Sequence, residues 1–315
     1  AYLDFSSGIG VTNLGFHPQV QQALLQQAGR IWHSPNLYLS SLQDQVAQEL
    51  AVSYNYLAFF CNSGAEANEA AIKLARKATG KQGVITFQQS FHGRTFGAMA
   101  ATGQDKIKEG FGDGVPHFSY AVYNNLASVE DLVNQDTAAV MLELVQGESG
   151  VRPAEATFVK NLADFCQREG ILLIVDEVQT GMGRTGQLYS FEHYGIIPDI
   201  VTLAKGLANG LPAGALLGKS GLAPAFGPGS HGSTFGGNKL AMAAALETLH
   251  IMKETGFMEE VRSKSAILLE QLQLAFQDHP NISAVRGLGM MIGIETSASL
   301  SRLVEAARQK GLIIL

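Results

Sequence analysis

Five short runs of continuously apolar residues, separated by stretches with helical periodicity, constrain the fold of this 315-residue chain more than any other feature. Apolar residues that do not alternate with polar ones are typical of strands buried on both faces, as in a parallel sheet covered by helices. We therefore predict an α/β fold with a mainly parallel sheet. The predicted strands are residues 83–87, 138–145, 171–177, 199–204 and 214–218.

Three regions of the chain differ in their pattern. Residues 35–248 hold the predicted strands and the helices between them, so we expect them to form a large domain. A long helix over 258–277 and further strands within 282–295 predict a smaller α+β domain over 249–315, with residues 1–34 packing against it. The chain begins without Met and stops after an apparent strand, so we expect the small domain to be incomplete.

The composition limits the class of partner. With 46% apolar residues, 16% charged residues and a net charge of −6, the chain has an ordinary globular composition and no basic excess for nucleic acid or anionic membrane. Cys61 and Cys166 do not have the spacing of a disulfide scaffold or a metal site, which favours a reducing cytoplasm. The residues suggest neither export nor membrane insertion. We expect small molecules or a second copy of the chain as partners.

The segment IVDEVQTGMGRTG, residues 174–186, contains two nucleotide-binding patterns. Its three glycines spell the G-x-G-x-x-G of dinucleotide-binding folds, but five residues separate the first glycine from the strand, and no acid follows at the required distance. Its two acids at a strand end resemble those of a nucleotide triphosphatase. The nearest phosphate-loop candidate, 214–220, is one residue short and lies downstream. The segment therefore argues against both kinds of nucleotide chemistry.

A helix start favours the binding of a phosphate. Ser63 and Glu66 form the S-x-x-E pattern of a capping box, so a helix is expected to begin at Gly64 and to leave the amides of Gly64 and Ala65 without partners. Such amides, aligned with the helix dipole, bind anions. An ordinary capped helix is the alternative. A later segment rich in glycine and hydroxyl groups could supply Thr234 to the same phosphate.

An acid and a lysine follow consecutive predicted strands. Asp176 ends one strand and Lys205 follows the next, and neighbouring strand ends form the usual ligand site of an α/β sheet. A desolvated lysine amine is nucleophilic and forms Schiff bases with carbonyls. Together with the phosphate site, the pair predicts pyridoxal phosphate, which needs a lysine for its aldehyde and an acid for its ring nitrogen. A purely structural salt bridge between the two side chains is the alternative.

Long ungapped segments resemble one enzyme family almost from end to end of the chain. They include NSGAEANEAAIKLARK, FHGRTFGAMAATGQ, VQGESGV, DEVQTGMGRTG, PDIVTLAKGLANGLPAGALLG and HGSTFGGN. These residues are similar to those of the class-III (ω-amino-acid) aminotransferases. The resemblance implies a fold-type-I transferase that depends on pyridoxal 5′-phosphate. It also implies a seven-stranded type of sheet in the large domain and a homodimer.

The resemblance implies cofactor roles for individual residues. Lys205 would hold the cofactor aldehyde as a Schiff base and move the substrate proton, and Asp176 would keep the ring nitrogen protonated. Gln179 would hydrogen-bond the phenolic oxygen of the ring, and Phe91 would stack on its face. The amides at the helix start would bind the phosphate. The further cofactor contacts are expected from Ser63, Gly64, Ala65, Glu177 and Val178.

Other residues resemble those that meet the substrate or a second subunit. Arg94 and Ser233 would contact the substrate, and Glu148 would pair with a carboxylate-binding arginine when no amino-group acceptor is bound. That arginine is expected beyond Leu315. Thr234 would reach the phosphate held by the neighbouring subunit.

The resemblance implies a specific reaction. The terminal amino group of N2-acetylornithine would pass to 2-oxoglutarate and give N-acetylglutamate 5-semialdehyde and glutamate, a cytoplasmic step of arginine biosynthesis. Succinylornithine, ornithine and 4-aminobutyrate are alternative donors, and a relative that binds the cofactor without transamination is a further alternative. Three of these residues have alternative roles outside the site. Phe91 could be a core aromatic, Arg94 a surface charge and Glu177 a local cap. His92 is expected to be structural.

Overall fold

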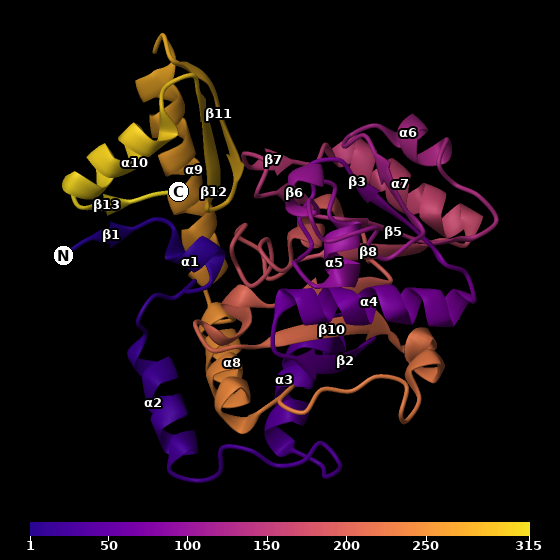
Figure 1. The fold of residues 1–315 in the computed structure, drawn as a ribbon. Helices are drawn as coiled ribbons and strands as arrows, with labels where there is room; N and C mark the ends of the chain where they lie inside the picture. Colours follow the sequence, from indigo (N-terminus) through magenta and orange to yellow (C-terminus); the bar gives the residue numbers. More distant parts are fainter.

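A seven-stranded sheet in the order β2-β10-β9-β8-β5-β3-β4 forms the centre of the protein (Figure 1). The computed structural model describes the backbone of residues 1–315 and every side chain except that of Val52. β10 runs antiparallel to both of its neighbours, and the other pairs are parallel. The predicted α/β fold with a mainly parallel sheet is therefore confirmed. The strands are β2 (Tyr56–Cys61), β3 (Gly83–Phe87), β4 (Phe118–Ala121), β5 (Thr137–Leu142), β8 (Leu172–Asp176), β9 (Ile200–Leu203) and β10 (Gly214–Lys219).

The predicted strands agree with the structure where the apolar runs lie inside the sheet. β3 matches its predicted run, β8 and β9 lie within theirs, and β10 extends its run by one residue. The single strand predicted over 138–145 is wrong. It is split into β5 and β6 (Val145–Gln146), because β6 leaves the sheet to pair with β7 (Arg152–Pro153). β2 and β4 lie outside the predicted strands.

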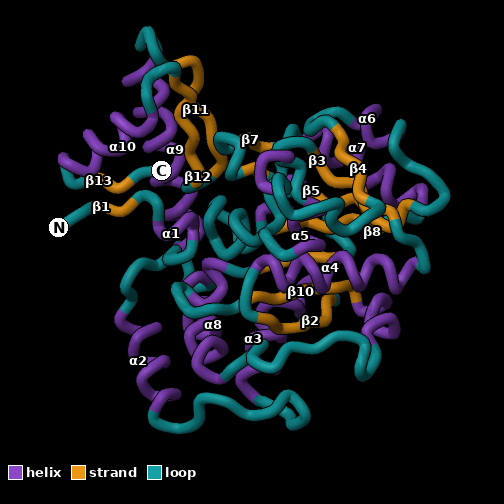
Figure 2. Tube along the Cα trace, viewed as in Figure 1, coloured by secondary structure: helices purple, strands orange, loops and turns teal.

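Helices cover both faces of the sheet (Figure 2). Ile174 of β8 packs in one hydrophobic cluster with Ala70 and Leu74, whereas its neighbours Leu173 and Val175 pack in the cluster on the opposite face. Alternate residues of one strand thus pack in two cores, which explains why β8 is apolar up to its last residue, Asp176. The covering helices are α3 (Ser41–Ala51), α4 (Gly64–Thr79), α5 (Phe96–Ala101), α6 (Leu126–Glu130), α7 (Ala156–Glu169) and α8 (Lys239–Met252).

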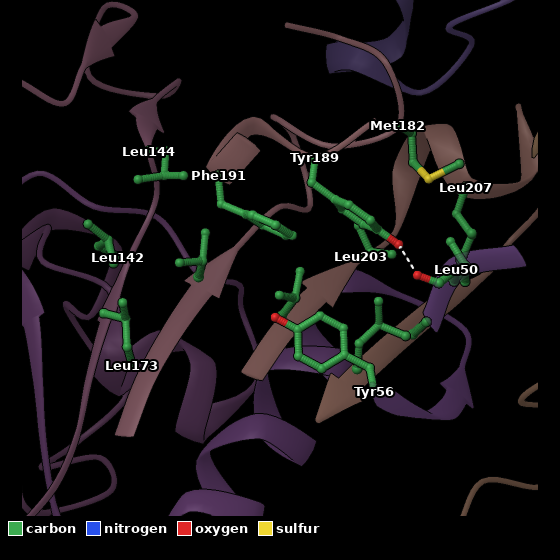
Figure 3. Packing of buried hydrophobic residues seen from close by; sticks show 14 of the residues in the cluster. Leu50, Tyr56, Leu142, Leu144, Leu173, Met182, Tyr189, Phe191, Leu203 and Leu207 are labelled. Atoms are coloured by element: carbon green, nitrogen blue, oxygen red, sulfur yellow. Dashed lines mark hydrogen bonds between the residues drawn. The ribbon is translucent and has the colours of Figure 1, made fainter. Parts of the chain in front are cut away.

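Aromatic side chains fix the path of the segment that follows β8 (Figure 3). The fully buried Tyr189 donates from its hydroxyl to the backbone oxygen of Leu50 at 2.7 Å, and its ring stacks on that of Phe191 with centroids 5.0 Å apart. Burying a side chain such as Leu or Phe contributes about 1.5–3 kcal/mol. The chain between β8 and η3 (Ser190–Tyr194) is therefore held firmly beside the strand ends.

The C-terminal elements gather around one long helix at the side of the sheet (Figure 1). This helix, α9 (Phe257–Phe276), lies one residue from the predicted 258–277, and the predicted strands form the hairpin of β11 (Ile282–Leu288) and β12 (Met291–Thr296). β1 (Leu3–Asp4) pairs in parallel with β13 (Leu312–Ile313), which brings the first residues beside the last. The division of the chain into 1–34, 35–248 and 249–315 stays a prediction.

The remaining elements are short or lie at the periphery. Among the helices that the described residues form, none is both long enough and apolar enough to cross a bilayer. These remaining elements are α1 (Ser7–Gly10), α2 (Pro18–Ala28), α10 (Leu300–Gln309), η1 (Val52–Tyr54), η2 (Asp105–Ile107), η4 (Lys205–Ala208) and η5 (Ser220–Phe226).

Candidate active site

A cavity of about 440 Å³ lies where β8 and β9 end and α4 begins. Small-molecule sites have volumes of about 300–1,000 Å³, and open α/β sheets bind their ligands at this edge. The cavity is therefore the candidate binding site for a substrate or cofactor. The predicted site residues that line it are Ser63, Gly64, Ala65, Phe91, Arg94, Glu148, Asp176, Val178, Gln179 and Lys205.

One end of the cavity is the first turn of α4. Ser63 caps this helix, because its hydroxyl accepts from the amide of Glu66 at 3.2 Å. Only this half of the predicted capping box forms. The Glu66 carboxylate accepts from the backbone and side-chain amides of Asn62 instead of returning to Ser63. The amides of Gly64 and Ala65 have no acceptor within a helix that starts here, so this end of the cavity suits an anion.

Close packing explains the glycine at the helix start. A Cβ at Gly64 would lie 2.7 Å and 2.9 Å from the two methyl groups of Val178. Val178 lies two residues after the end of β8, so only a glycine lets the helix start and this segment approach so closely. The helix start that suits an anion and the segment after β8 are therefore in direct contact through Gly64 and Val178.

Asp176 is a buried carboxylate with three hydrogen-bond donors. Its exposed fraction is 3%, and one oxygen accepts from the side chains of Asn68 and His92, each at 2.8 Å. Its other oxygen accepts from the amide of Val178 at 2.9 Å. Burying an ionised carboxylate is costly unless such donors compensate it. The site therefore holds a fixed negative charge that faces the cavity.

His92 contacts this charge directly, and the expectation that it is structural stays a prediction. A carboxylate has no proton to give, so His92 Nδ1 donates to Asp176, and the buried Nε2 has no partner among the described residues. Burial opposes the charged form of His92. The hydrogen bond and charge of Asp176 nevertheless raise the pKa of the imidazole above its ordinary value.

Glu143 is a second buried acid of the cavity, and no sequence prediction included it. Its carboxylate accepts from the backbone amide of Phe91 at 2.9 Å. Burial raises the pKa of Glu143 to about 8, the nearby charge of Asp176 adds to the effect, and His92 and Lys205 oppose it. At neutral pH this group is therefore mostly the neutral acid. An acid that interrupts an apolar strand run, as in AAVMLELV, is the signal that could have identified it.

Lys205 follows β9 in an uncommon backbone conformation. Its φ is 44°, in the left-handed region that side chains other than glycine rarely adopt. Burial lowers the pKa of the Lys205 amine, while Asp176, Glu148 and Glu143 oppose this and the positive charge of Arg184 adds to it. The fraction of neutral, nucleophilic amine is thus larger than for an exposed lysine.

The alternative of a structural salt bridge between Lys205 and Asp176 is wrong. Within the part of the chain whose side chains are described, the ion pairs closer than 4.0 Å do not include Lys205. The oxygens of Asp176 accept from Asn68, His92 and Val178 instead. The amine and the carboxylate therefore both remain available to a ligand in the cavity.

Other predicted residues form the walls and rim. Gln179 packs against Gly147 so closely that a Cβ at this glycine would lie 1.7 Å from its side-chain oxygen. The Arg94 guanidinium lies over the Phe91 ring, 5.5 Å from its centre, at the exposed rim. Glu148 is also exposed and lines the cavity. The cationic and acidic side chains at the rim suit a charged substrate.

Three predicted site residues do not line the cavity. Glu177 is fully buried, and its carboxylate accepts from Thr180, Ser190 and the amide of Phe191, so the structure shows the local role. The Ser233 hydroxyl accepts a hydrogen bond from the side chain of Asn62. Asn62 lines the cavity and Ser233 does not. Thr234 is exposed outside the cavity, so it does not serve a phosphate of its own chain.

Comparison with known proteins identifies the family. All of residues 1–315 match the family described as Aminotransferase class-III. The chain belongs to the class-III aminotransferases. It is 69% identical to acetylornithine aminotransferase of Streptococcus mutans, over 100% of this chain and 83% of that protein.

Two solved structures extend this comparison of the class-III aminotransferase. Ornithine aminotransferase of Toxoplasma gondii, which has pyridoxal phosphate at partial occupancy in its active site, matches with a TM-score of 0.95 at 30% identity. The match covers 99% of this chain and 78% of that one. N-acetylornithine aminotransferase of Stenotrophomonas maltophilia matches with a TM-score of 0.84 at 34% identity, over 100% of this chain and 82% of that one. The match to fold-type-I aminotransferases agrees with the predicted fold.

The residues of this class-III aminotransferase fit pyridoxal phosphate, the cofactor of the family. The cavity offers an anion-binding helix start, a buried acid for a ring nitrogen and a lysine amine that forms no ion pair within 4.0 Å among the described side chains. These three groups line one space at the strand ends. The fit depends on Gly64, because a Cβ there would collide with the strand end.

Proposed function

We propose that this chain transfers the terminal amino group of N2-acetylornithine to 2-oxoglutarate, giving N-acetylglutamate 5-semialdehyde and glutamate. It is a pyridoxal-phosphate-dependent aminotransferase, and relatives 53–69% identical over the whole chain are acetylornithine aminotransferases. The observation that carries the chemistry is one cavity lined by an unpaired lysine amine, a buried carboxylate and a helix start. The proposed setting is arginine biosynthesis.

Bound pyridoxal phosphate supplies an electron sink that stabilises negative charge on the substrate carbon. In the proposed site, Asp176 would keep the ring nitrogen protonated, and its three hydrogen-bond donors orient the carboxylate. Lys205 would hold the cofactor aldehyde through its amine, and the free amine would move the proton at the substrate carbon. The amides of Gly64 and Ala65 bind the phosphate through the N-terminus of α4.

The proposed walls orient the ring and the substrate. Phe91 would pack on a ring face, and Gln179, which lies against Gly147, would hydrogen-bond the phenolic oxygen. At the rim, Arg94 attracts a substrate carboxylate, and Glu148 balances the positive charge there when no acceptor is bound. The acceptor 2-oxoglutarate and the donor N2-acetylornithine would then bind at this rim one after the other, as in a ping-pong reaction.

A second copy of the chain is part of the proposal. Large apolar side chains are exposed along one N-terminal stretch, with Leu37 90%, Tyr38 72% and Leu39 98% exposed, and Phe235 is 63% exposed beside Thr234. Exposed apolar surface of this kind supports an interface. In such a homodimer, Thr234 would reach the phosphate of the partner subunit. The two free cysteines, both buried, are consistent with the proposed cytoplasmic location.

Donor specificity decides between the proposed reaction and its nearest alternatives. We would measure glutamate formed from 2-oxoglutarate with N2-acetylornithine, succinylornithine, ornithine and 4-aminobutyrate, and compare kcat/KM for the four donors. The proposal predicts the highest value for N2-acetylornithine. A higher value for another donor would reassign the substrate. Bound cofactor with no glutamate from any donor would exclude transamination.

A further inference from the structure

Arg184, the arginine of the GMGRTG segment, is a largely buried cation that the proposed reaction does not use. Burial lowers the pKa of its guanidinium, and no carboxylate counters this effect. Its Nε is buried without a hydrogen-bond partner among the described side chains. Keeping an unpaired charge away from water is costly, so the position requires an explanation beyond packing.

The guanidinium contacts the N-terminal segment instead of an acid. Arg184 Nη2 donates to the side-chain oxygen of Asn13 and lies 3.5 Å from the hydroxyl of Ser7. The Asn13 amide nitrogen in turn donates to the backbone oxygen of Met182 at 2.7 Å. Asn13 therefore connects the N-terminal segment to two residues of the GMGRTG turn, 169 and 171 positions away.

Asn13 also lies against the turn that carries Lys205. A Cβ at Gly206 would be 2.4 Å from the Asn13 amide nitrogen and 3.1 Å from Cβ of Met182. Two further hydrogen bonds hold the other end of η4. Asn209 accepts from the amide of Leu14 at 3.0 Å and donates to the backbone oxygen of Gly15 at 2.9 Å. The N-terminal segment thus braces η4 at both ends.

The braced backbone is strained. Lys205, Asn209 and Met182 have φ values of 44°, 44° and 55°, each in the left-handed region. Such a conformation is unfavourable and persists only where its surroundings hold it. Asn13 is part of these surroundings, because it lies against Gly206, the neighbour of Lys205.

We propose that Arg184 and Asn13 are positioning residues that hold the backbone turn of Lys205 against the N-terminal segment. The proposal rests on the proposed role of Lys205 as the cofactor-binding amine. Arg184 is also one of four charged groups that act on this amine, with Asp176, Glu148 and Glu143. Removing its positive charge is therefore expected to let Lys205 keep its proton to higher pH.

Three variants and one control separate geometry from charge. Asn13→Ala removes the bridge, Arg184→Lys keeps the charge but not the planar fork, and Arg184→Gln keeps a polar side chain but has no charge. Arg302→Gln changes an exposed arginine of α10 and serves as the control. For each protein we would measure kcat and KM per bound cofactor. The pH dependence of the rate at which cofactor-free protein regains visible absorbance with added pyridoxal phosphate would be the second measurement.

The proposal predicts that Asn13→Ala and Arg184→Lys lower kcat per bound cofactor by about 10- to 100-fold, because small displacements of a reacting group have effects of this size. KM changes little, and absorbance returns at least about tenfold more slowly. Arg184→Gln moves the pH midpoint of that rate upwards, and Arg184→Lys does not. The control resembles the wild type.

Several results would overturn the proposal. If the variants lose thermal stability but keep the wild-type kcat and reattachment rate per bound cofactor, Asn13 and Arg184 support the fold only. If the Arg184 variants do not fold, Asn13→Ala decides by the same criteria. A wild-type protein that regains absorbance but forms no glutamate would disprove the proposed reaction, and the reattachment rates would still test the positioning residues.

Discussion

Adding one methyl group at Gly64 tests the proposed phosphate end of the site. Gly64 is the first residue of α4 and does not have a positive φ, so alanine can adopt its backbone conformation. The added Cβ would nevertheless lie 2.7 Å and 2.9 Å from the two methyl groups of Val178. Val178 has a stiff β-branched side chain, and its amide donates to Asp176. Either the helix start or this hydrogen bond must therefore move.

The size of the effect follows from the cost of overpacking. Extra atoms in a well-packed place typically cost about 1–3 kcal/mol. If this cost falls on the cofactor-bound state, Gly64→Ala weakens pyridoxal phosphate binding by about 5- to 150-fold. Cofactor-free protein would be titrated with pyridoxal phosphate, and the dissociation constant would be determined from the visible absorbance.

Two further variants make this test specific. Gly221→Ala places a methyl group in open space and should leave the affinity unchanged. Val178→Ala in the Gly64→Ala background removes the colliding methyl groups and should restore most of the affinity. Wild-type affinity in Gly64→Ala, or no recovery in the double variant, would refute the steric reasoning.

Two other predictions concern the acids of the cavity. In Asp176→Asn, the amide must turn its NH2 group towards at least one buried donor, at a cost of about 1–3 kcal/mol, and the ring nitrogen loses its charged partner. We expect turnover to fall about 100-fold or more in steady-state assays, and undiminished turnover would contradict this. The folded-state pKa of Glu143 is about 8 against an ordinary 4.5, so the folded protein keeps a proton that the unfolded chain releases, and stability falls as pH rises between these values. Urea unfolding should show Glu143→Gln gaining stability relative to wild type from about pH 4.5 to 8 and no further gain above. A stability difference between Glu143→Gln and wild type that does not change with pH would refute the raised pKa of Glu143.

The sheet could be predicted from sequence where strands are buried on both faces. β3, β8 and β9 are mostly apolar because alternate residues pack in two cores, as Leu173 and Ile174 show. The orientation of β10 could not be predicted, because an apolar run does not record its direction. The split between β5 and β6 depends on pairing with β7, which a strand pattern does not reveal.

The site could be predicted in part, because some of its residues belong to short sequence patterns and others are brought together only by the fold. The capped start of α4 is a local pattern, and Asp176 and Lys205 follow strand ends. The partners of Asp176 have no such signal, since His92 and Asn68 lie 84 and 108 positions away in the chain. Asn68 follows Gly64 by one helical turn, so the face it shares with the helix start is the only hint the sequence holds.

The identity of the modified lysine tests the central claim most directly. The purified protein would be treated with borohydride, which makes the bond between cofactor and protein permanent, then digested and analysed by mass spectrometry. We predict that the cofactor is attached to the peptide containing Lys205, and that Lys205→Ala carries no attached cofactor. Attachment at another lysine, or cofactor bound to the wild-type protein without a covalent bond, would contradict the proposed site.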